Sequence, residues 1–173
     1  KGQFFYQLYF QTPGVAEAEF EKDVRTALRK FYHSASGELD LSTLAEKSAD
    51  DDLLTSLIDP EKMGEWLTAN DLDFYVSEFT QSGFAGPLNY YRNHNLTWEL
   101  NAGKPTEIDQ PALFIAGERD GVIAMTGPAL QDMPNFVKDL RTNVLIPKIG
   151  HWTQQEAPDA VNGYLLDWLA GLN

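Results

Sequence analysis

The sequence predicts an α/β fold in which a helical region precedes a region of alternating strands and helices. Two short runs, residues 112–116 and 143–147, are apolar on both faces, as strands buried in a parallel sheet are. A helix-length segment follows each run, and the last one, from Pro158, carries its apolar residues on one face. Two strands leave bare edges, so we expect more strands to join this sheet from outside the sequence.

The region before the strands is predicted to be helical. Its clearest helix has one apolar stripe, in which apolar residues recur at spacings of three to five: Val15, Phe20, Val24, Leu28 and Phe31. A Ser-rich and then acidic stretch over residues 33–59 predicts a loop with at most short helices. Beyond it we expect a short helix from Pro60 to Leu67, and another that is capped by Asn70 and ended by Gly83.

A polar segment that contains a proline, Lys104–Asp109, separates the two regions. The 173 residues are enough to build a domain with a hydrophobic core. We therefore expect a helical domain over residues 1–103 and a strand-and-helix domain over residues 104–173.

The composition excludes several classes of function. With 13 Lys and Arg against 26 Asp and Glu, the formal net charge is −13, which suits neither nucleic acid nor an anionic membrane surface. No apolar stretch approaches the ~18 residues that span a bilayer. The sequence has no cysteine, which rules out a disulfide framework and a thiolate site and fits a cytoplasmic origin.

The strongest candidates for chemistry are Asp120 and His151. Asp120 follows the first apolar run and His151 follows the second, so both fall at the carboxyl ends of predicted strands, where functional groups of open α/β sheets collect. A carboxylate that holds one imidazole nitrogen leaves the other nitrogen as a base near neutral pH. The alternative is structural, with an Asp that forms the turn or caps a helix and a His on the surface.

A nucleophile for this pair is missing from the sequence. There is no Gly-x-Ser-x-Gly elbow, no Gly-rich dinucleotide or phosphate loop and no His-Glu-x-x-His motif. The three histidines, at positions 33, 94 and 151, lack the spacing of metal ligands, so we expect no metal site. The pair is therefore the back half of a nucleophile–histidine–acid site.

Four segments resemble, in order, parts of the soluble epoxide hydrolases of the α/β-hydrolase superfamily. Phe5–Gly14 is similar to the start of that family's cap domain and Gly83–Asn93 to its late part, while Ala116–Asp120 and Gly150–Gln154 are similar to its acid and base segments. The segments span nearly the whole chain, and Tyr-Gln-Leu-Tyr-Phe-Gln and Asn-Tyr-Tyr-Arg-Asn are the most specific stretches. The resemblance implies an α/β-hydrolase fold, with a helical cap (lid) as the first domain and the C-terminal part of the hydrolase core as the second.

The resemblance also implies a reaction, the conversion of an epoxide and water to a vicinal diol without a metal or organic cofactor. In this family an aspartate opens the epoxide and forms an ester, two cap tyrosines donate to the epoxide oxygen, and a His–Asp pair activates the water that hydrolyses the ester. A phenol suits the donor role because its reference pKa of about 10 keeps it protonated at neutral pH. By position, the tyrosines are Tyr6 and Tyr91, the base is His151 and its acid is Asp120.

Each of these tyrosines has a neighbour that must be told apart from it, Tyr9 near Tyr6 and Tyr90 beside Tyr91. Adjacent residues of a helix point about 100° apart, so Tyr90 and Tyr91 cannot both face one pocket. Without the resemblance, all four would be interpreted as core or interface aromatics. The resemblance further suggests four residues of the substrate pocket: Phe4, Phe5, Gln7 and Trp152.

The family's first half supplies the central strands, an oxyanion-binding turn and the nucleophilic aspartate, and the sequence holds none of these. We expect a companion chain that carries them, or an N-terminal half that the sequence leaves out. The expected partners are thus a small-molecule epoxide and that N-terminal half, with a homo-oligomer left open.

Three alternatives to this function remain open. Within the same superfamily, one alternative is a haloalkane or haloacid dehalogenase, which would have a halide-binding Trp or Arg at the positions of the tyrosines. Another is an esterase, which would have serine as its nucleophile. The third alternative is not an enzyme but a helical interaction module, in which Asp120 and His151 are structural.

Overall fold

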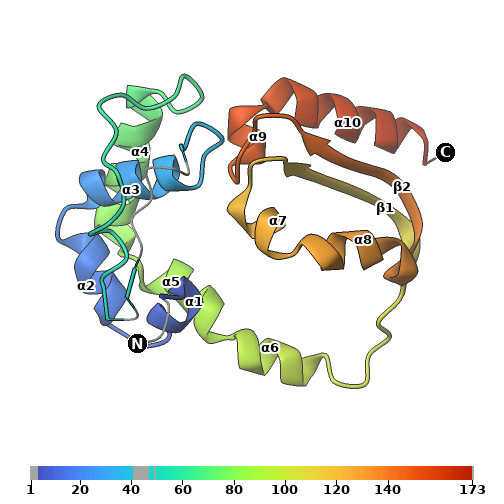
Figure 1. The fold of residues 1–173 in the computed structure, drawn as a ribbon, viewed down its shortest axis with the longest axis horizontal. Coiled ribbons are helices and arrows are strands. Elements are labelled where there is room, and N and C mark those ends of the chain that lie inside the picture. The colour runs from blue at the N-terminus through green and yellow to red at the C-terminus, as the bar shows by residue number, and fades with distance from the viewer. Residues whose placement is uncertain (1–3, 41–46, 49, 173) are drawn as a thin grey trace. The chain divides into compact units, whose positions relative to one another are not determined.

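Two units make up the fold, which Figure 1 shows in a computed structural model. Lys1–Ser34 and Asp40–Ala102 form the first unit, and Ala35–Leu39 and Gly103–Asn173 form the second. Part of the loop expected over residues 33–59 lies outside the described residues. The structure describes these residues: 4–40, 47, 48 and 50–172.

The first unit consists of short helices around an aromatic and aliphatic core. Its helices are α1 (Tyr6–Tyr9), α2 (Val15–Glu21), α3 (Val24–Ser34), α4 (Ala69–Ser82), α5 (Ala85–Arg92) and α6 (His94–Leu100). Phe10, which directly follows α1, is 1% exposed and packs in the core with Phe20 and Leu88. A four-residue helix is not stable by itself, so this burial rather than helix propensity holds α1 in place.

The apolar stripe that predicted one helix in fact runs over two. After α2 ends at Glu21, the Asp23 carboxylate accepts hydrogen bonds from the backbone N–H (3.1 Å) and the hydroxyl (2.8 Å) of Thr26, in the manner of a helix cap. Phe20 and Leu28, on either side of the break, are both buried in the core. The hydrophobic period does not change at the break, which is why the stripe alone did not reveal it.

The helix expected from Pro60 to Leu67 was a wrong prediction, since the segment is made of turns and bends. The Pro60 carbonyl accepts a hydrogen bond from the guanidinium of Arg29, which also pairs with Asp59 at 3.0 Å. The Leu67 N–H donates to the carbonyl of Gly64, and the Leu67 side chain is buried. These anchors, together with the poor helix propensity of glycine, outweigh the start signal of the proline.

Helix α4 begins earlier than predicted, because its cap is Thr68 and not Asn70. The Thr68 hydroxyl accepts a hydrogen bond from the Asp71 N–H (3.2 Å), and the Asp71 carboxylate accepts one from the Thr68 N–H (3.0 Å). This reciprocal pairing is a capping box. Gly83 ends the helix, as predicted, with a φ of 68° that favours glycine.

The second unit has the predicted order of strand, helix, strand and helix. β1 (Ile108–Gly117) and β2 (Val137–Ile146) form a parallel pair in which Ile115 lies opposite Val144. Figure 1 shows α10 on one side of this pair and α8 on the other. The helices of this unit are α7 (Gly121–Met125), α8 (Gly127–Phe136), α9 (Thr153–Glu156) and α10 (Pro158–Ala170).

Both strands are longer than predicted, because their first halves are polar. β1 already starts at Ile108, inside the segment expected as a linker, and β2 already starts at Val137. Burial is confined to the carboxyl ends, where Ala116 and Ile146 are covered, whereas Ile108 is 48% exposed. In the described residues the sheet has two strands, so each strand has one edge without a hydrogen-bonded neighbour. This fits the expectation of further strands.

Candidate functional site

Asp120 and His151 meet within the second unit. β1 ends at Gly117 and β2 at Ile146, and the loops that follow bring Nδ1 of His151 to 2.9 Å from Oδ2 of Asp120. The side chain of Asp120 is 9% exposed and that of His151 is 44% exposed. The acid is thus enclosed by protein, while the imidazole is accessible.

The sequence left two roles open for Asp120, that of a helix cap and that of a partner of His151, and Asp120 fills both. Its Oδ1 accepts the Val122 N–H at 2.8 Å and so caps α7, while Oδ2 faces His151. An ionised carboxylate can only accept, so Nδ1 of His151 carries the hydrogen of this bond, and in the neutral imidazole the lone pair is then on Nε2. The Trp152 ring packs edge-on against the imidazole, with centroids 5.1 Å apart. The imidazole is thus bordered by the Trp152 ring, and among the described residues none is bonded to its Nε2.

The acid loop and the base loop are joined through their main chains. The Arg119 N–H donates to the Ile149 carbonyl at 2.8 Å, and the Glu118 N–H donates to the Ile146 carbonyl at 3.0 Å. A Cβ atom at Gly117 would lie 2.1 Å from the carbonyl oxygen of Gly150. Only glycine permits so close an approach. The distance between Asp120 and His151 is therefore set by backbone contacts.

Tyr6 and Tyr91 meet within the first unit, although most of the helical sequence separates them. Their ring centroids are 5.8 Å apart at an interplanar angle of 85°. Both rings also contact Phe10, at 5.8 Å from Tyr6 and 4.9 Å from Tyr91. Burial raises the pKa of Tyr91, and the nearby Tyr6 and Tyr90 raise it further. Tyr91 thus stays a protonated donor well above neutral pH.

The two neighbouring tyrosines have different surroundings. The Tyr9 hydroxyl donates to Oε2 of Glu19 at 2.8 Å, and burial, the first cause, together with this carboxylate strongly raises its pKa. Tyr90 is 74% exposed, and its ring meets that of Tyr91 at 83°. Tyr90 and Tyr91 therefore face different ways, as the helix geometry predicted, and the Tyr9 hydroxyl is occupied by a structural partner.

Of the four suggested pocket residues, three contact a member of the two pairs. The Phe5 ring lies 5.5 Å from that of Tyr6, and the Gln7 amide donates to the Tyr6 hydroxyl at 3.1 Å. Trp152 contacts His151, as described above. Phe4 packs differently, with its ring 5.6 Å from that of Tyr9 and the Lys47 ammonium 4.6 Å from its centroid.

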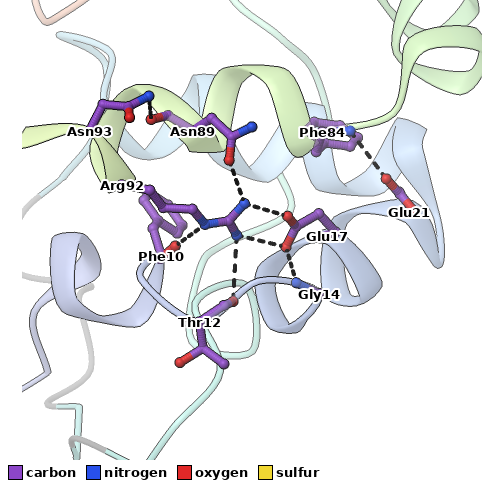
Figure 2. A network of polar contacts seen from close by, with 9 residues as sticks. All are labelled: Phe10, Thr12, Gly14, Glu17, Glu21, Phe84, Asn89, Arg92 and Asn93. Atoms are coloured by element: carbon purple, nitrogen blue, oxygen red, sulfur yellow. Dashed lines mark hydrogen bonds and ion pairs between the residues drawn. The ribbon is translucent and has the colours of Figure 1, made fainter.

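Arg92 joins the helix of Tyr91 to α2 and to the turn after α1, as Figure 2 shows. Its Nη1 and Nη2 donate to the Glu17 carboxylate at 2.7 and 3.0 Å, and its Nε donates to the Phe10 carbonyl at 2.8 Å. Only 13% of the Arg92 side chain and 12% of that of Glu17 are exposed. The Arg92 hydrogen bond is the main cause that holds the pKa of Glu17 below its ordinary value. Since Phe10 touches Tyr6 and Tyr91, this ion pair also fixes the two tyrosines.

The sequence alone does not reveal this ion pair, because 75 positions separate its members. A single sequence pairs charges reliably only at helical spacing, three or four residues apart. The one available signal was the place of Arg92 next to Tyr91 in the Asn-Tyr-Tyr-Arg-Asn stretch.

The described part of the chain offers no assembled metal site. Its His, Asp and Glu side chains form no group of three or more that could hold an ion. Within the same residues, every helix is too short or too polar to cross a membrane.

The sequence is similar to epoxide hydrolases along nearly its whole length. It is 37% identical to epoxide hydrolase A of Mycobacterium tuberculosis, over 98% of this chain and 53% of that protein. It is 35% identical to bifunctional epoxide hydrolase 2 of Rattus norvegicus, over 96% of this chain and 29% of that protein. No family model matches the sequence. The chain thus spans about half the length of the first of these relatives, and less of the second.

Solved structures agree with this similarity. An epoxide hydrolase from an endophytic Streptomyces superposes with a TM-score of 0.92 at 39% identity, over 98% of this chain and 53% of that one. Epoxide hydrolase A from Mycobacterium thermoresistibile gives 0.89 at 38% identity, over 100% and 54%. These neighbours have the α/β-hydrolase fold. The predicted fold, a helical cap with the C-terminal part of a hydrolase core, and the resemblance to epoxide hydrolases are thereby confirmed.

Proposed function

We propose that this chain, which matches about half of an epoxide hydrolase of the α/β-hydrolase fold, takes part in the hydrolysis of an epoxide to a vicinal diol. It supplies two functional pairs, each assembled within one unit: Tyr6 with Tyr91, and His151 with Asp120. The first pair serves ring opening and the second serves hydrolysis of the resulting ester.

Ring opening needs a proton donor at the epoxide oxygen. An aspartate outside this chain attacks one epoxide carbon, the carbon–oxygen bond breaks, and an ester bond to the aspartate forms. The alkoxide oxygen takes a proton from Tyr6 or Tyr91, and the second phenol donates a hydrogen bond to it. The contact between the two rings supports this assignment, since it directs two phenols from distant segments toward one region.

Ester hydrolysis needs a base for water. Nε2 of His151 takes a proton from water while Asp120 stabilises the imidazolium through Nδ1. The hydroxide attacks the ester carbonyl, the carboxylate of the aspartate is regenerated, and the diol leaves. The imidazolium of His151 then releases its proton to solvent and the tyrosinate takes one from solvent, so that the sum is epoxide plus water to diol. The reaction as proposed draws on no metal or organic cofactor.

The proposal includes the partners that this scheme requires. These are a small-molecule epoxide and the polypeptide that carries the nucleophile, either as a companion chain or as the other half of the same protein. Phe5, Gln7 and Trp152 are proposed to contact the epoxide because each touches a member of the two pairs. A homo-oligomer and a cytoplasmic location remain predictions.

The observation that carries the proposal is the 2.9 Å contact of His151 with Asp120 in a chain of this similarity. The complete enzyme should convert styrene oxide to the diol. In a single turnover in ¹⁸O-labelled water, the new diol oxygen should be unlabelled, because it comes from the aspartate carboxylate. A labelled diol in that turnover would contradict the ester. Activity on haloalkanes or carboxylic esters instead of epoxides would favour the dehalogenase or esterase alternative.

A further inference from the structure

The loop that carries His151 is held by hydrogen bonds that three consecutive backbone N–H groups donate. The Gly150 N–H donates to Oε2 of Glu156 at 3.0 Å, and the Trp152 N–H donates to Oε1 of the same carboxylate at 3.2 Å. Between them, the His151 N–H donates to the Ala35 carbonyl at 2.8 Å. One side chain and one carbonyl thus determine the backbone on both sides of the imidazole.

Glu156 reaches beyond this loop to a segment that precedes it by more than a hundred residues. Its Oε2 also accepts the Gly37 N–H at 2.9 Å, so the carboxylate receives three backbone hydrogen bonds. From the other side, Nη1 of Arg119 in the acid loop donates to the Gly37 carbonyl at 2.8 Å. Ala35–Leu39, which belongs to the second unit, is therefore bonded to both functional loops of that unit.

The packing between this segment and the loop leaves no room for a side chain at either Gly37 or Gly150. A Cβ atom on Gly37 would lie 2.0 Å from the Lys148 carbonyl oxygen, and one on Gly150 would lie 2.3 Å from the Gly37 nitrogen. Lys148 itself has a φ of 67°, a conformation that costs energy for a residue other than glycine. Such a conformation persists only where its surroundings determine it, and here it directs the chain from β2 into the His151 loop.

We propose that Glu156 is a positioning residue for His151, and that it acts by fixing the loop between Gly150 and Trp152 against Ala35–Leu39. This inference rests on the proposed function, since it assigns Glu156 to the hydrolysis of the ester. Glu156 acts by position rather than by chemistry, because each described hydrogen bond of its carboxylate comes from a backbone N–H group. Its carboxylate suits three donors because an ionised carboxylate offers only acceptors.

Glu156→Gln in the complete enzyme tests the proposal. The glutamine keeps the length of the side chain but replaces one acceptor oxygen by an NH₂ group, which must turn toward N–H donors. A shift of about 1 Å in a catalytic group can cost about 10²-fold in rate. In single turnovers followed by mass spectrometry, we expect the ester to form at the wild-type rate and to be hydrolysed about 10- to 100-fold more slowly. The accumulated ester is a signal that general destabilisation would not produce.

Two further variants complete the test. Asp159→Asn, an exposed carboxylate on α10, undergoes the same change of charge and should leave both steps unchanged. Arg119→Met removes only the bond to the Gly37 carbonyl, and it should slow hydrolysis about 3- to 10-fold, which decides the matter if Glu156→Gln does not fold. The deciding variant is Glu156→Gln, or Arg119→Met if Glu156→Gln does not fold. If it slows ester formation and ester hydrolysis equally, or slows neither of them, the inference is overturned. Failure of the wild-type enzyme to form any ester would instead refute the proposed function.

Discussion

Tyr6 and Tyr91 stand edge to face, with ring centroids 5.8 Å apart and planes at 85°, although they belong to α1 and α5. The buried ring of Phe10 touches both. Two phenols that share one buried support are held close to each other, which is what the proposed ring opening requires.

Replacing either phenol should slow ring opening. Tyr6→Phe and Tyr91→Phe each remove one donor and keep the ring contacts, and the loss of one preorganised donor costs about 10²- to 10³-fold in rate. The measurement is ester formation in rapid-quench single turnovers of the complete enzyme. Tyr90→Phe, at the 74% exposed neighbour, serves as the control and should open the ring at the wild-type rate. Unchanged ring opening in both single variants would defeat the assignment of the tyrosines.

The two roles of Asp120 can be separated by two substitutions. Asp120→Asn keeps an oxygen to cap α7 but loses the charge beside His151, so ester hydrolysis should slow by about 10³- to 10⁴-fold with little change in stability. Asp120→Ala loses the cap as well, and its free energy of unfolding should be about 1 kcal/mol lower than that of Asp120→Asn. Kinetics and thermal unfolding of the two variants check this, and equal stability of both would show that the cap contributes nothing.

The ion pair of Glu17 and Arg92 should make stability depend on acid pH. A carboxyl group whose pKa is lowered in the folded protein stabilises it above the unfolded pKa, and this contribution is lost as the pH falls through the folded pKa. Folding lowers the pKa of Glu17 from an ordinary value of 4.5. We expect Glu17→Gln to cost about 2 kcal/mol at pH 7, and the difference from the wild type to shrink below pH 4.5.

Denaturant unfolding of the complete enzyme between pH 7 and pH 3 measures this effect. Glu78→Gln, at an exposed carboxylate on α4, is the matched control and should stay within about 0.5 kcal/mol of the wild type. Because the ion pair supports Tyr91, Glu17→Gln should also slow ring opening while ester hydrolysis keeps its rate. A stability difference that does not vary with pH would contradict the role of the Glu17 charge.

Gly117 should tolerate no side chain. Gly117→Ala places a methyl group 2.1 Å from the Gly150 carbonyl oxygen, so the acid and base loops must move apart. We expect a loss of about 1–3 kcal/mol in the free energy of unfolding, together with slower ester hydrolysis. Gly163→Ala in α10, where a Cβ meets no atom within 4 Å, is the comparison and should be neutral or slightly stabilising. Wild-type hydrolysis in Gly117→Ala would show that the close approach has no part in the site.

Local signals in the sequence were enough for much of the fold. The parallel strands, the helix from Pro158 and the end of α4 at Gly83 each follow from a hydrophobic period or a cap within a short window. The break at Asp23 and the turns after Pro60 were missed because one kept the hydrophobic period and the other depends on Arg29. A local cap determined the first, and a tertiary contact determined the second.

The residues of the candidate site likewise include some that the sequence predicted and some that it did not. Asp120 and His151 were found because strand order places both at one edge, and the tyrosines because their surroundings resemble a family. Glu156 and Arg92 were not singled out as partners of these groups, since their acceptors and donors are backbone atoms or a charge far along the chain. Backbone hydrogen bonds cannot be predicted from the residue types that make them, except where a close approach of two main chains requires glycine.

The assignment of Ala35–Leu39 to the second unit limits how the protein can be recombined. An exchange of residues 1–103 for the corresponding part of a relative would replace this segment together with the helices, and the His151 loop and Glu156 would meet a foreign backbone. A chimaera that retains Ala35–Leu39 from the parent keeps those hydrogen bonds. The boundary between the two units is thus discontinuous in sequence, and an exchange of the helical unit that leaves Ala35–Leu39 in place needs two crossovers more than a linear domain map suggests.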